Sequence, residues 1–324
     1  MIDAAIVGLG RWGRSLLESV HGESERIRFV RAADTAAESR RYAEAHGLPF
    51  SSSLDEALND LSARAVVLAT PHSLHRNQVI AAASAGKHVF CEKPLALTAA
   101  DASAMLAACR KAGVQLAVGH NRRFWPAMQA LKRIVSDGSL GRLLHIEGHN
   151  SNENSDRVTG GWRTLPGESP GGGFTGAGLH VLDSFVYLFG PVRRVYAQLR
   201  SYDKGIPPLD AMSAMYEFEN GFSGTLATVR ATPFYWRVHI FGSLGSAEVL
   251  GETELILRMR GKPPERLSCE PADSRRAELE AFADAVEGRA PFPISGEHML
   301  ATVSAFEATL CSLRSGAREE VEPT

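Results

Sequence analysis

Three glycines near the N-terminus have a spacing that lets the backbone approach a phosphate group closely. Gly8, Gly10 and Gly13 follow a short apolar run, Ala4 to Val7, and precede a helical stretch. Glycines in a strand-to-helix turn permit a tight bend, and the first N–H groups of the helix then point at an anion. Because this spacing also arises by chance, its position directly after the first strand carries the argument. The motif predicts a site for the pyrophosphate of a dinucleotide.

An acidic residue, Asp34, ends the second predicted strand, 21 residues after Gly13. A carboxylate there accepts hydrogen bonds from ribose hydroxyls and repels a 2′-phosphate, which favours NAD over NADP. Asp34 could instead only cap the following helix, and Arg40 and Arg41 lie close enough along the chain to meet a phosphate. We expect NAD to be preferred and NADP to be used less readily.

Several strings farther along the chain are more specific than the glycine motif. With them the chain resembles the glucose-fructose oxidoreductase, inositol dehydrogenase and rhizopine catabolism family, called Gfo/Idh/MocA, from residue 2 to at least 190. The strings are Ala69-Thr70-Pro71-His72-Ser73-Leu74-His75, the run from Ala85 to Leu95 that contains Glu92-Lys93-Pro94, Asn121-Arg122-Arg123-Phe124, Trp162-Arg163, and Gly171-Gly172-Gly173 leading to His180-Val181-Leu182-Asp183.

The resemblance implies that Lys93 stands beside the nicotinamide and contacts the reacting hydroxyl, and that the peptide before Pro94 is cis. An ammonium fixed near a developing alkoxide stabilises negative charge and can shuttle a proton. We expect the cofactor to be bound by residues of the glycine motif and of the matched strings: Gly8, Gly10, Arg11, Trp12, Gly13, Asp34, Thr70, Pro71, His75, Glu92, Lys93 and Asn121.

The resemblance implies a second catalytic residue, His180, in a family pattern of Asp-x-Gly-x-His. Gly178 matches this pattern, but Gly176 stands where the aspartate should be. A neutral imidazole can accept the hydroxyl proton as the hydride leaves carbon, so His180 is the expected general base. Asp183, one helical turn farther on, could support it. The missing carboxylate leaves open how the imidazole is oriented and how substrate hydroxyls are held.

A polar segment precedes the glycine run and is a candidate for substrate recognition, although it could equally be a solvated loop. It contains Asn150, Asn152, Asn154, Asp156, Arg157, Trp162 and Arg163. Of these only Arg163 matches a family position, and its guanidinium could hold a carboxylate through two hydrogen bonds. Lys93, Arg163 and His180 are therefore the expected substrate-binding residues. Tyr235 and Trp236 are expected to pack in a sheet.

The first half of the chain alternates short apolar strands with longer helical stretches, which is typical of a doubly wound parallel sheet. Gly22, Gly47, Gly86 and Gly113 mark helix ends. The strands are expected at 4–7, 29–33, 65–69, 88–91 and 115–118, and the helices at 12–20, 36–46, 54–59, 74–85 and 99–112.

After residue 121 the order changes to one more helix, at 126–136, and then to long alternating runs. Asn220-Gly221 predicts a hairpin with a type I′ turn. Strands are expected at 143–150, 194–202, 211–219, 222–232 and 236–242, and helices at 179–189, 274–286 and 297–313 should cover one face of their sheet. The predicted fold is an α/β Rossmann domain over 1–121 and an α+β substrate-binding and oligomerisation domain over 122–324, with a largely antiparallel, open-faced sheet.

The whole chain sets limits on its partners. It has 324 residues and a formal charge of −2, so it fits two domains and has no net field to attract nucleic acid or an anionic membrane. The N-terminus enters a strand directly, no apolar run reaches the roughly 20 residues of a membrane span, and the four cysteines are scattered. We expect a cytoplasmic protein with reduced thiols, no metal, and a homodimer or a tetramer of dimers.

The sequence thus predicts an NAD(H)-dependent oxidoreductase that acts on a secondary alcohol, or the ketone, of a sugar, polyol or related small cyclic compound. Two alternatives remain open. The first is a glycosidase or epimerase-like enzyme that uses bound NAD transiently. The second is a non-catalytic NAD-binding sensor, which the glycine at position 176 makes conceivable and which the retention of Lys93 and His180 opposes.

Overall fold

The computed structural model describes residues 1–152, 161–165, 167–202, 210–230 and 232–322. The chain divides into two compact units. The first contains Met1–Asn121 and Asp273–Met299, and the second contains Arg122–Ala272 and Leu300–Thr324. The boundary between the units after residue 121 coincides with the change in the sequence pattern there. Residues 273–299, which we assigned to the second domain, group with the first.

The first unit is built on a six-stranded sheet in the order β3-β2-β1-β4-β5-β6. All of its strand pairs are parallel, which confirms the doubly wound fold and its usual strand order. The sequence analysis did not predict strand β3, because a strand of two residues is too short to show a pattern. The strands are β1 (Ile2–Val7), β2 (Ile27–Ala33), β3 (Phe50–Ser51), β4 (Ala65–Leu68), β5 (His88–Glu92) and β6 (Leu116–Gly119).

Local signals in the sequence begin and end the helices of this unit. Helix α5 (Ala99–Ala112) begins where the Thr98 hydroxyl accepts a hydrogen bond from the Asp101 N–H, and ends at Gly113, whose φ is +68°. The other predicted helix ends also have glycines with positive φ. The remaining helices are α1 (Arg11–Val20), α2 (Ala37–Ala45), α3 (Leu54–Asn59) and α4 (His75–Ser84), with short 3-10 turns η1 (His72–Leu74) and η2 (Asn121–Phe124).

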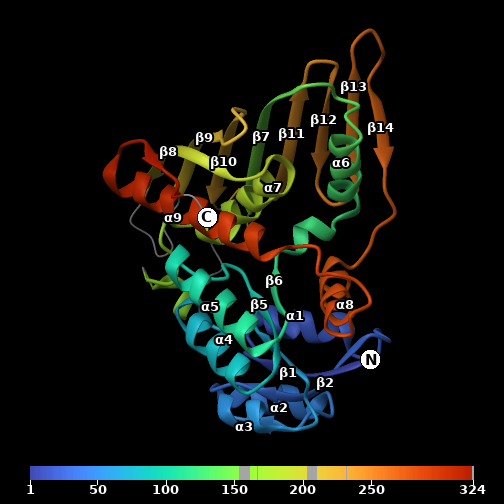
Figure 1. Cartoon of the computed structure of the whole chain (residues 1–324), viewed down its shortest axis with the longest axis vertical. Coiled ribbons are helices and arrows are strands. Elements are labelled where there is room, and N and C mark those ends of the chain that lie inside the picture. The colour runs from blue at the N-terminus through green and yellow to red at the C-terminus, as the bar shows by residue number, and fades with distance from the viewer. Residues whose placement is uncertain (153–160, 166, 203–209, 231, 323–324) are drawn as a thin grey trace. The chain divides into compact units, whose positions relative to one another are not determined.

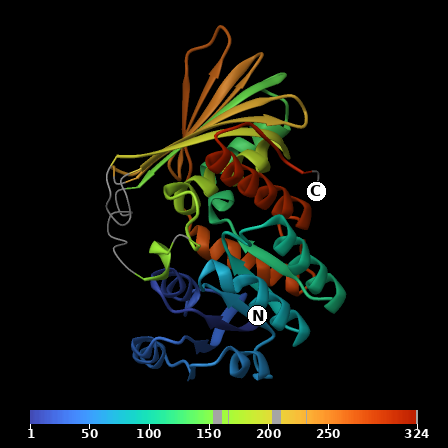
Figure 2. The ribbon, with the colours of Figure 1, turned by 90° about the vertical axis from the view of Figure 1, so that its left-hand side faces the viewer.

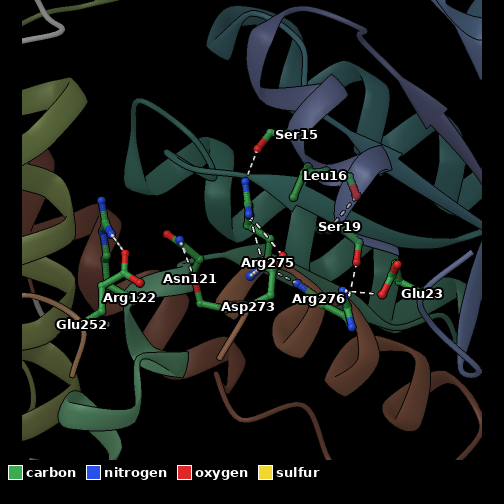
Figure 3. Close-up of polar contacts among 11 residues, drawn as sticks. Ser15, Leu16, Ser19, Glu23, Asn121, Arg122, Glu252, Asp273, Arg275 and Arg276 are labelled. Carbon is green, nitrogen blue, oxygen red and sulfur yellow. Dashed lines mark hydrogen bonds and ion pairs between the residues drawn. The ribbon is translucent and has the colours of Figure 1, made fainter. Parts of the chain in front are cut away.

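Helix α8 (Ser274–Val286) belongs to the first unit, contrary to the expectation that it covers the antiparallel sheet. It packs on α1, β2 and β5, and the Phe282 ring meets the Phe90 ring edge-on at 5.9 Å. Figure 3 shows two arginines that fasten it to α1: Arg275 donates to the Ser15 hydroxyl, and Arg276 donates to the Ser19 carbonyl at 2.8 Å. An amphipathic pattern shows that a helix has a buried face, but not which sheet buries it.

The second unit is built on a nine-stranded sheet in the order β14-β13-β12-β11-β7-β10-β9-β8-β15. Only β7 and β10 pair in parallel, so the sheet is largely antiparallel, as predicted. The strands are β7 (Leu143–Asn152), β8 (Val192–Ser201), β9 (Asp210–Phe218), β10 (Ser223–Arg230), β11 (Tyr235–Gly242), β12 (Gly245–Leu250), β13 (Glu254–Met259), β14 (Glu265–Ser268) and β15 (Glu319–Glu320).

Helices α6 (Pro126–Ser136) and α7 (Leu179–Phe189) and residues 300–315 of α9 (Gly296–Ser315) cover one face of this sheet (Figure 1). The covered face is apolar, with Ile146, Leu226 and Val238 fully or almost fully buried. No helix of the described ranges lies on the opposite face, as Figure 2 shows. That outer face therefore exposes alternate side chains of the strands, and Met215 is 58% exposed.

The hairpin predicted at Asn220-Gly221 joins β9 and β10, but its loop differs from the expected turn. The Gly221 N–H bonds to the Phe218 carbonyl, the Phe218 N–H bonds to the Phe222 carbonyl, and Gly221 has a φ of +83°. These bonds define a three-residue loop with the glycine in last place, where a left-handed residue follows a type I turn. The Asn-Gly pair identified the turn correctly, while the pairing of the strands set its length.

Two further features concern the chain as a whole. No helix in the described part of the chain is long and apolar enough to cross a membrane. All four cysteines are free thiols, and burial raises the pKa of Cys109 to about 11.

The N-cap of α8 gives a test of how this helix is attached to the first unit. The Asp273 carboxylate accepts from the Arg275 and Arg276 N–H groups at 3.0 and 3.3 Å. Asp273→Ala should lower the free energy of unfolding by about 0.5–2 kcal/mol, measured by urea denaturation. Asp273→Asn keeps a capping oxygen and should stay close to wild type. Equal losses in both variants would show that charge, not capping, stabilises the start of α8.

Candidate active site

The three glycines of the loop in the first unit differ in what a side chain at each position would meet. Gly8 has a φ of +93°, and a Cβ there would lie 2.6 Å from the Ala69 carbonyl oxygen. A Cβ on Gly13 would lie 1.8 Å from the Gly8 carbonyl oxygen. A Cβ on Gly10 would meet nothing within 4 Å, and no side chain caps the start of α1 among the described residues. The loop thus keeps open the position where a pyrophosphate would meet the helix N-terminus.

Asp34 holds this loop and contacts two residues at the start of the next helix. Its carboxylate accepts from the Leu9 N–H at 2.5 Å, the Ala36 N–H at 2.9 Å and the Ser39 hydroxyl at 3.1 Å. A carboxylate has about four acceptor positions, so roughly one remains for a ribose hydroxyl. The N-cap of α2 is Ala36 and has no side-chain cap hydrogen bond, so Asp34 does not cap this helix. Ribose binding by Asp34 stays a prediction.

Lys93 lies on the turn that follows β5, and a buried histidine holds this turn. The peptide between Lys93 and Pro94 is cis, as the resemblance implied. His75 is fully buried, and its Nδ1 and Nε2 lie 2.9 Å from the Pro94 carbonyl oxygen and 3.1 Å from the Thr70 carbonyl oxygen. His75 therefore ties the turn that carries Lys93 to the end of β4, beside Thr70 and Pro71.

Two more expected residues, Glu92 and Asn121, are held by close packing in the same unit. A Cβ on Gly119 would lie 2.5 Å from a carboxylate oxygen of Glu92, so the glycine makes room for this acid. The Asn121 amide donates to the Ser274 hydroxyl at 3.1 Å, which links the end of β6 to the start of α8. Arg11 is exposed, and Trp12 packs partly buried against the core. Together the residues of this unit fit a dinucleotide.

His180 lies in the first turn of α7, in the second unit, and is 8% exposed. A π-helix over Phe174–Gly178 leads directly into α7, a form that occurs often at functional sites. Gly176, at the position of the missing aspartate, is exposed, and a Cβ there would meet nothing within 4 Å. The Asn150 amide donates to the Ala177 carbonyl at 2.9 Å and fastens the π-helix to β7.

Asp183 is the buried anchor of α7. Arg123 donates to both of its carboxylate oxygens at 2.7–3.1 Å, and the two side chains are 2% and 1% exposed. The Thr302 hydroxyl of α9 donates to the same carboxylate at 3.5 Å. The Arg123 guanidinium also lies 4.8 Å from the Tyr187 ring centre. Asp183 thus fixes the helix that carries His180, while direct support of the imidazole by Asp183 stays a prediction.

A second buried ion pair fixes the glycine run that precedes the π-helix. Arg230 lies 3.2 Å from Asp210, whose side chain is fully buried. The Asp210 carboxylate also accepts from the Gly173 N–H at 3.3 Å. A Cβ on Gly172, whose φ is +58°, would lie 2.4 Å from an oxygen of the same carboxylate. The glycines therefore allow the backbone to pass close to Asp210.

The polar segment expected to recognise substrate is only partly described. Asn150 and Asn152 belong to β7, and Asn154, Asp156 and Arg157 lie outside the described residues. Arg163 lies in a 3-10 turn, η4 (Trp162–Thr164), with its guanidinium 4.2 Å from the Trp162 ring centre. Trp236 packs in the sheet as expected, edge-on to Trp125 at 5.1 Å.

Comparison with known proteins supports the geometry of both units. Residues 2–120 match a family described as "Oxidoreductase family, NAD-binding Rossmann fold", and residues 128–248 match the GFO/IDH/MocA C-terminal domain. The chain is 30% identical to the 2,7-anhydro-N-acetylneuraminate hydratase of Escherichia coli, over 81% of this chain and 71% of the relative. The chain belongs to the GFO/IDH/MocA family.

Two other proteins resemble the chain over most of their length. The 1,5-anhydro-D-fructose reductase of Ensifer adhaerens is 29% identical, over 87% of each chain. The WlbA dehydrogenase of Bordetella pertussis, solved with NADH and UDP-GlcNAcA, is 25% identical, with a TM-score of 0.87 over 100% of this chain and 98% of that one. This GFO/IDH/MocA chain is an NAD-binding oxidoreductase.

Sequence reasoning missed several residues that shape these sites. Ser274 bonds to Asn121, which lies 153 positions away along the chain. Arg123 bonds to Asp183, which lies 60 positions away. Arg123 and Asp183 each stood in a matched string, so the signal was present, but no pattern said that they pair. Asn150 was noted only as part of a polar segment.

The Arg123–Asp183 pair gives a test of what holds α7 in place. Arg123→Met would leave a buried carboxylate without its cation, so the free energy of unfolding should fall by about 3–5 kcal/mol, measured by chemical denaturation. The double variant Arg123→Met/Asp183→Leu should recover part of this loss. As a control, Arg194→Met removes a partly exposed arginine from pairs with Glu217 and Glu320 and should cost at most about 1 kcal/mol. Equal losses at Arg123 and Arg194 would contradict the anchoring role of Arg123.

Proposed function

We propose that this protein uses NAD to oxidise a secondary alcohol of a sugar, polyol or related small cyclic compound, or reduces the corresponding ketone. The observation that carries the proposal is the placement of Lys93 in the unit that has the dinucleotide loop. Buried His75 contacts the Pro94 carbonyl there, and the Glu92 carboxylate accepts from the Lys93 N–H at 3.2 Å. This bracing supports a role for Lys93 at a reacting oxygen, where an ammonium stabilises developing negative charge.

In this proposal the two candidate catalytic residues have complementary tasks. The Lys93 ammonium donates a hydrogen bond to the substrate oxygen and stabilises the negative charge that develops there. The neutral imidazole of His180 accepts the hydroxyl proton. Bound NAD would supply the acceptor for the hydride. Arg163 is the third proposed contact, toward a polar or carboxylate group of the substrate.

The names of the relatives support a small cyclic substrate and keep a second reaction in view. The reductase from Ensifer adhaerens is named for an anhydro sugar, which fits a hydride transfer to a carbonyl. The relative from Escherichia coli is named a hydratase, which does not imply net oxidation. Net turnover of cofactor separates the two: a dehydrogenase accumulates NADH with substrate, whereas an enzyme that uses NAD transiently forms product without it.

A direct assay tests the proposed reaction and its residues. The panel is 1,5-anhydro-D-fructose, 2,7-anhydro-N-acetylneuraminate, D-glucose and myo-inositol, followed by NADH absorbance and product analysis. On a compound that is turned over, Lys93→Met and His180→Ala should each lower kcat about 100- to 10,000-fold, because each removes an acid–base or charge-stabilising group. Affinity for NAD(H), measured by calorimetry, should stay almost unchanged.

Matched controls come from exposed residues of the same types. Lys111→Met and His21→Ala change exposed side chains of the first unit and should leave kcat near wild type. Wild-type turnover by both Lys93→Met and His180→Ala would refute the mechanism. A loss at Lys93 alone would move the proton acceptor away from His180.

We also propose that the outer face of the nine-stranded sheet binds a second copy of this chain. Charged residues alternate there across four neighbouring strands: Glu147 on β7, Arg237 on β11, Glu248 on β12 and Arg258 on β13. Arg237 contacts both glutamates, and Arg258 lies 2.8 Å from Glu248. If a two-fold axis reverses this row in the second copy, each acid faces a base.

The surroundings of this charged row also suit a partner. A hollow of about 390 Å³ beside it is lined by residues that include Tyr196, Met215 and Ala227. Burial lowers the pKa of His239, so this histidine is neutral near pH 7 and adds no charge to the row. An exposed mixed surface with self-complementary charge is typical of an isologous interface.

Light scattering tests this self-association. The wild type should have at least twice the mass of one chain, which is 35.0 kDa. Arg237→Glu places a third acid beside Glu147 and Glu248, so this variant should dissociate at micromolar concentration. Arg110→Glu makes the same charge change at an exposed residue of α5 in the first unit and should leave the assembly intact. A monomeric wild type would refute the interface.

A further inference from the structure

Three polar side chains form a row across adjacent strands on the covered face of the nine-stranded sheet. Asn150 on β7 is paired in register with Thr228 on β10 and with Trp236 on β11. These residues are 3%, 1% and 1% exposed. Their neighbours on the same face, two positions back along β7 and β10 and two positions on along β11, are Gly148, Leu226 and Val238. The row therefore lies at the end of this face where the buried Asp210–Arg230 pair also lies, whereas the neighbouring positions Gly148, Leu226 and Val238 are apolar.

Each side chain of this polar row has one atom without a hydrogen-bond partner among the described residues. The atoms are Asn150 Oδ1, Thr228 Oγ1 and Trp236 Nε1. The Asn150 amide nitrogen donates to the Ala177 carbonyl, which fixes the orientation of the amide, because the flipped form would face two oxygens toward each other. Buried polar groups without partners are costly and rare, so three in one row call for a partner from outside the chain.

The polar row lies under the segment that carries the candidate general base. Asn150 bonds to the π-helix at Ala177, three residues before His180. A Cβ on Gly178 would lie 2.8 Å from the Thr228 methyl group, so the start of α7 packs directly on Thr228. The Gly176 position, where the family pattern has an aspartate, offers no side chain for binding a substrate hydroxyl.

We propose that Thr228, Asn150 and Trp236 bind hydroxyl groups of the substrate, and that this polar row replaces the recognition that an aspartate at position 176 would provide. The proposal rests on the proposed function, in which the substrate is a sugar or polyol. Asn150 Oδ1 accepts, Trp236 Nε1 donates, and the Thr228 hydroxyl does either. A substrate hydroxyl both donates and accepts, so it can satisfy neighbouring atoms of this row, which an apolar or purely anionic group cannot.

Thr228→Val is the sharpest test, because it removes the hydroxyl and keeps nearly the same shape. On a compound of the panel that the wild type turns over, kcat/KM should fall about 10-fold, mainly through KM. Affinity for NAD(H) should not change, and Tm should stay the same or rise, because the lost hydroxyl has no partner within the described chain. Thr228→Ser should restore most of the activity. Thr253→Val makes the same change in the turn between β12 and β13 and should behave as wild type.

A substrate-side experiment tests the polar row without altering the fold. Among the mono-deoxy derivatives of the same compound, we expect one for which the wild type has a kcat/KM about 10-fold lower than for the parent compound. Thr228→Val should have the same kcat/KM for this derivative and for the parent compound. If Thr228→Val changes Tm but neither KM nor this discrimination, the row holds only internal water and the proposal is wrong. Failure of the wild type on every compound of the panel would instead contradict the proposed function, and the row with it.

Discussion

The buried ion pair between Arg123 and Asp183 is the interaction on which the second unit depends most. Both side chains are almost completely shielded from water, so neither charge is stable without the other. The pair joins the segment after β6 to the middle of α7, and Thr302 connects it to α9. Because His180 lies one turn before Asp183 on the same helix, its position is set by this pair rather than by a loop.

The two units prepare their candidate sites by different means. In the first, the main requirement is space: Gly8, Gly13 and Gly119 lie where a Cβ would collide with a neighbour, and Gly10 keeps open the approach to a helix N-terminus. In the second, the main requirement is the pairing of buried polar groups, as at Asp183 and Asp210. A phosphate is bound by backbone N–H groups, which need small residues, whereas catalytic side chains need rigid support from the residues behind them.

The nine-stranded sheet separates the two proposed kinds of recognition by its two faces. The alternation of side chains along each strand sends Asn150 and Thr228 toward α7 and sends Glu147 and Thr225 outward. A one-residue shift in register would exchange these sets. The close contact of Gly148 with Val181 and Phe185 opposes such a shift, because any side chain at this position would clash with α7. The same packing thus keeps the inner polar row and the outer charged row on their own faces.

The sequence by itself determined the Rossmann fold of the first unit, the helix ends at Gly22, Gly47, Gly86 and Gly113, the position of the hairpin at Gly221 and the family. These features depend on residues close together in the chain, whose patterns are directly visible. The tertiary structure decided that α8 packs with α1, that Asn121 bonds to Ser274, that Arg123 pairs with Asp183, and that Asn150 lies between Thr228 and Trp236. These contacts join residues far apart in the chain, and an amphipathic or polar pattern shows that a side chain needs a partner without showing which one it meets.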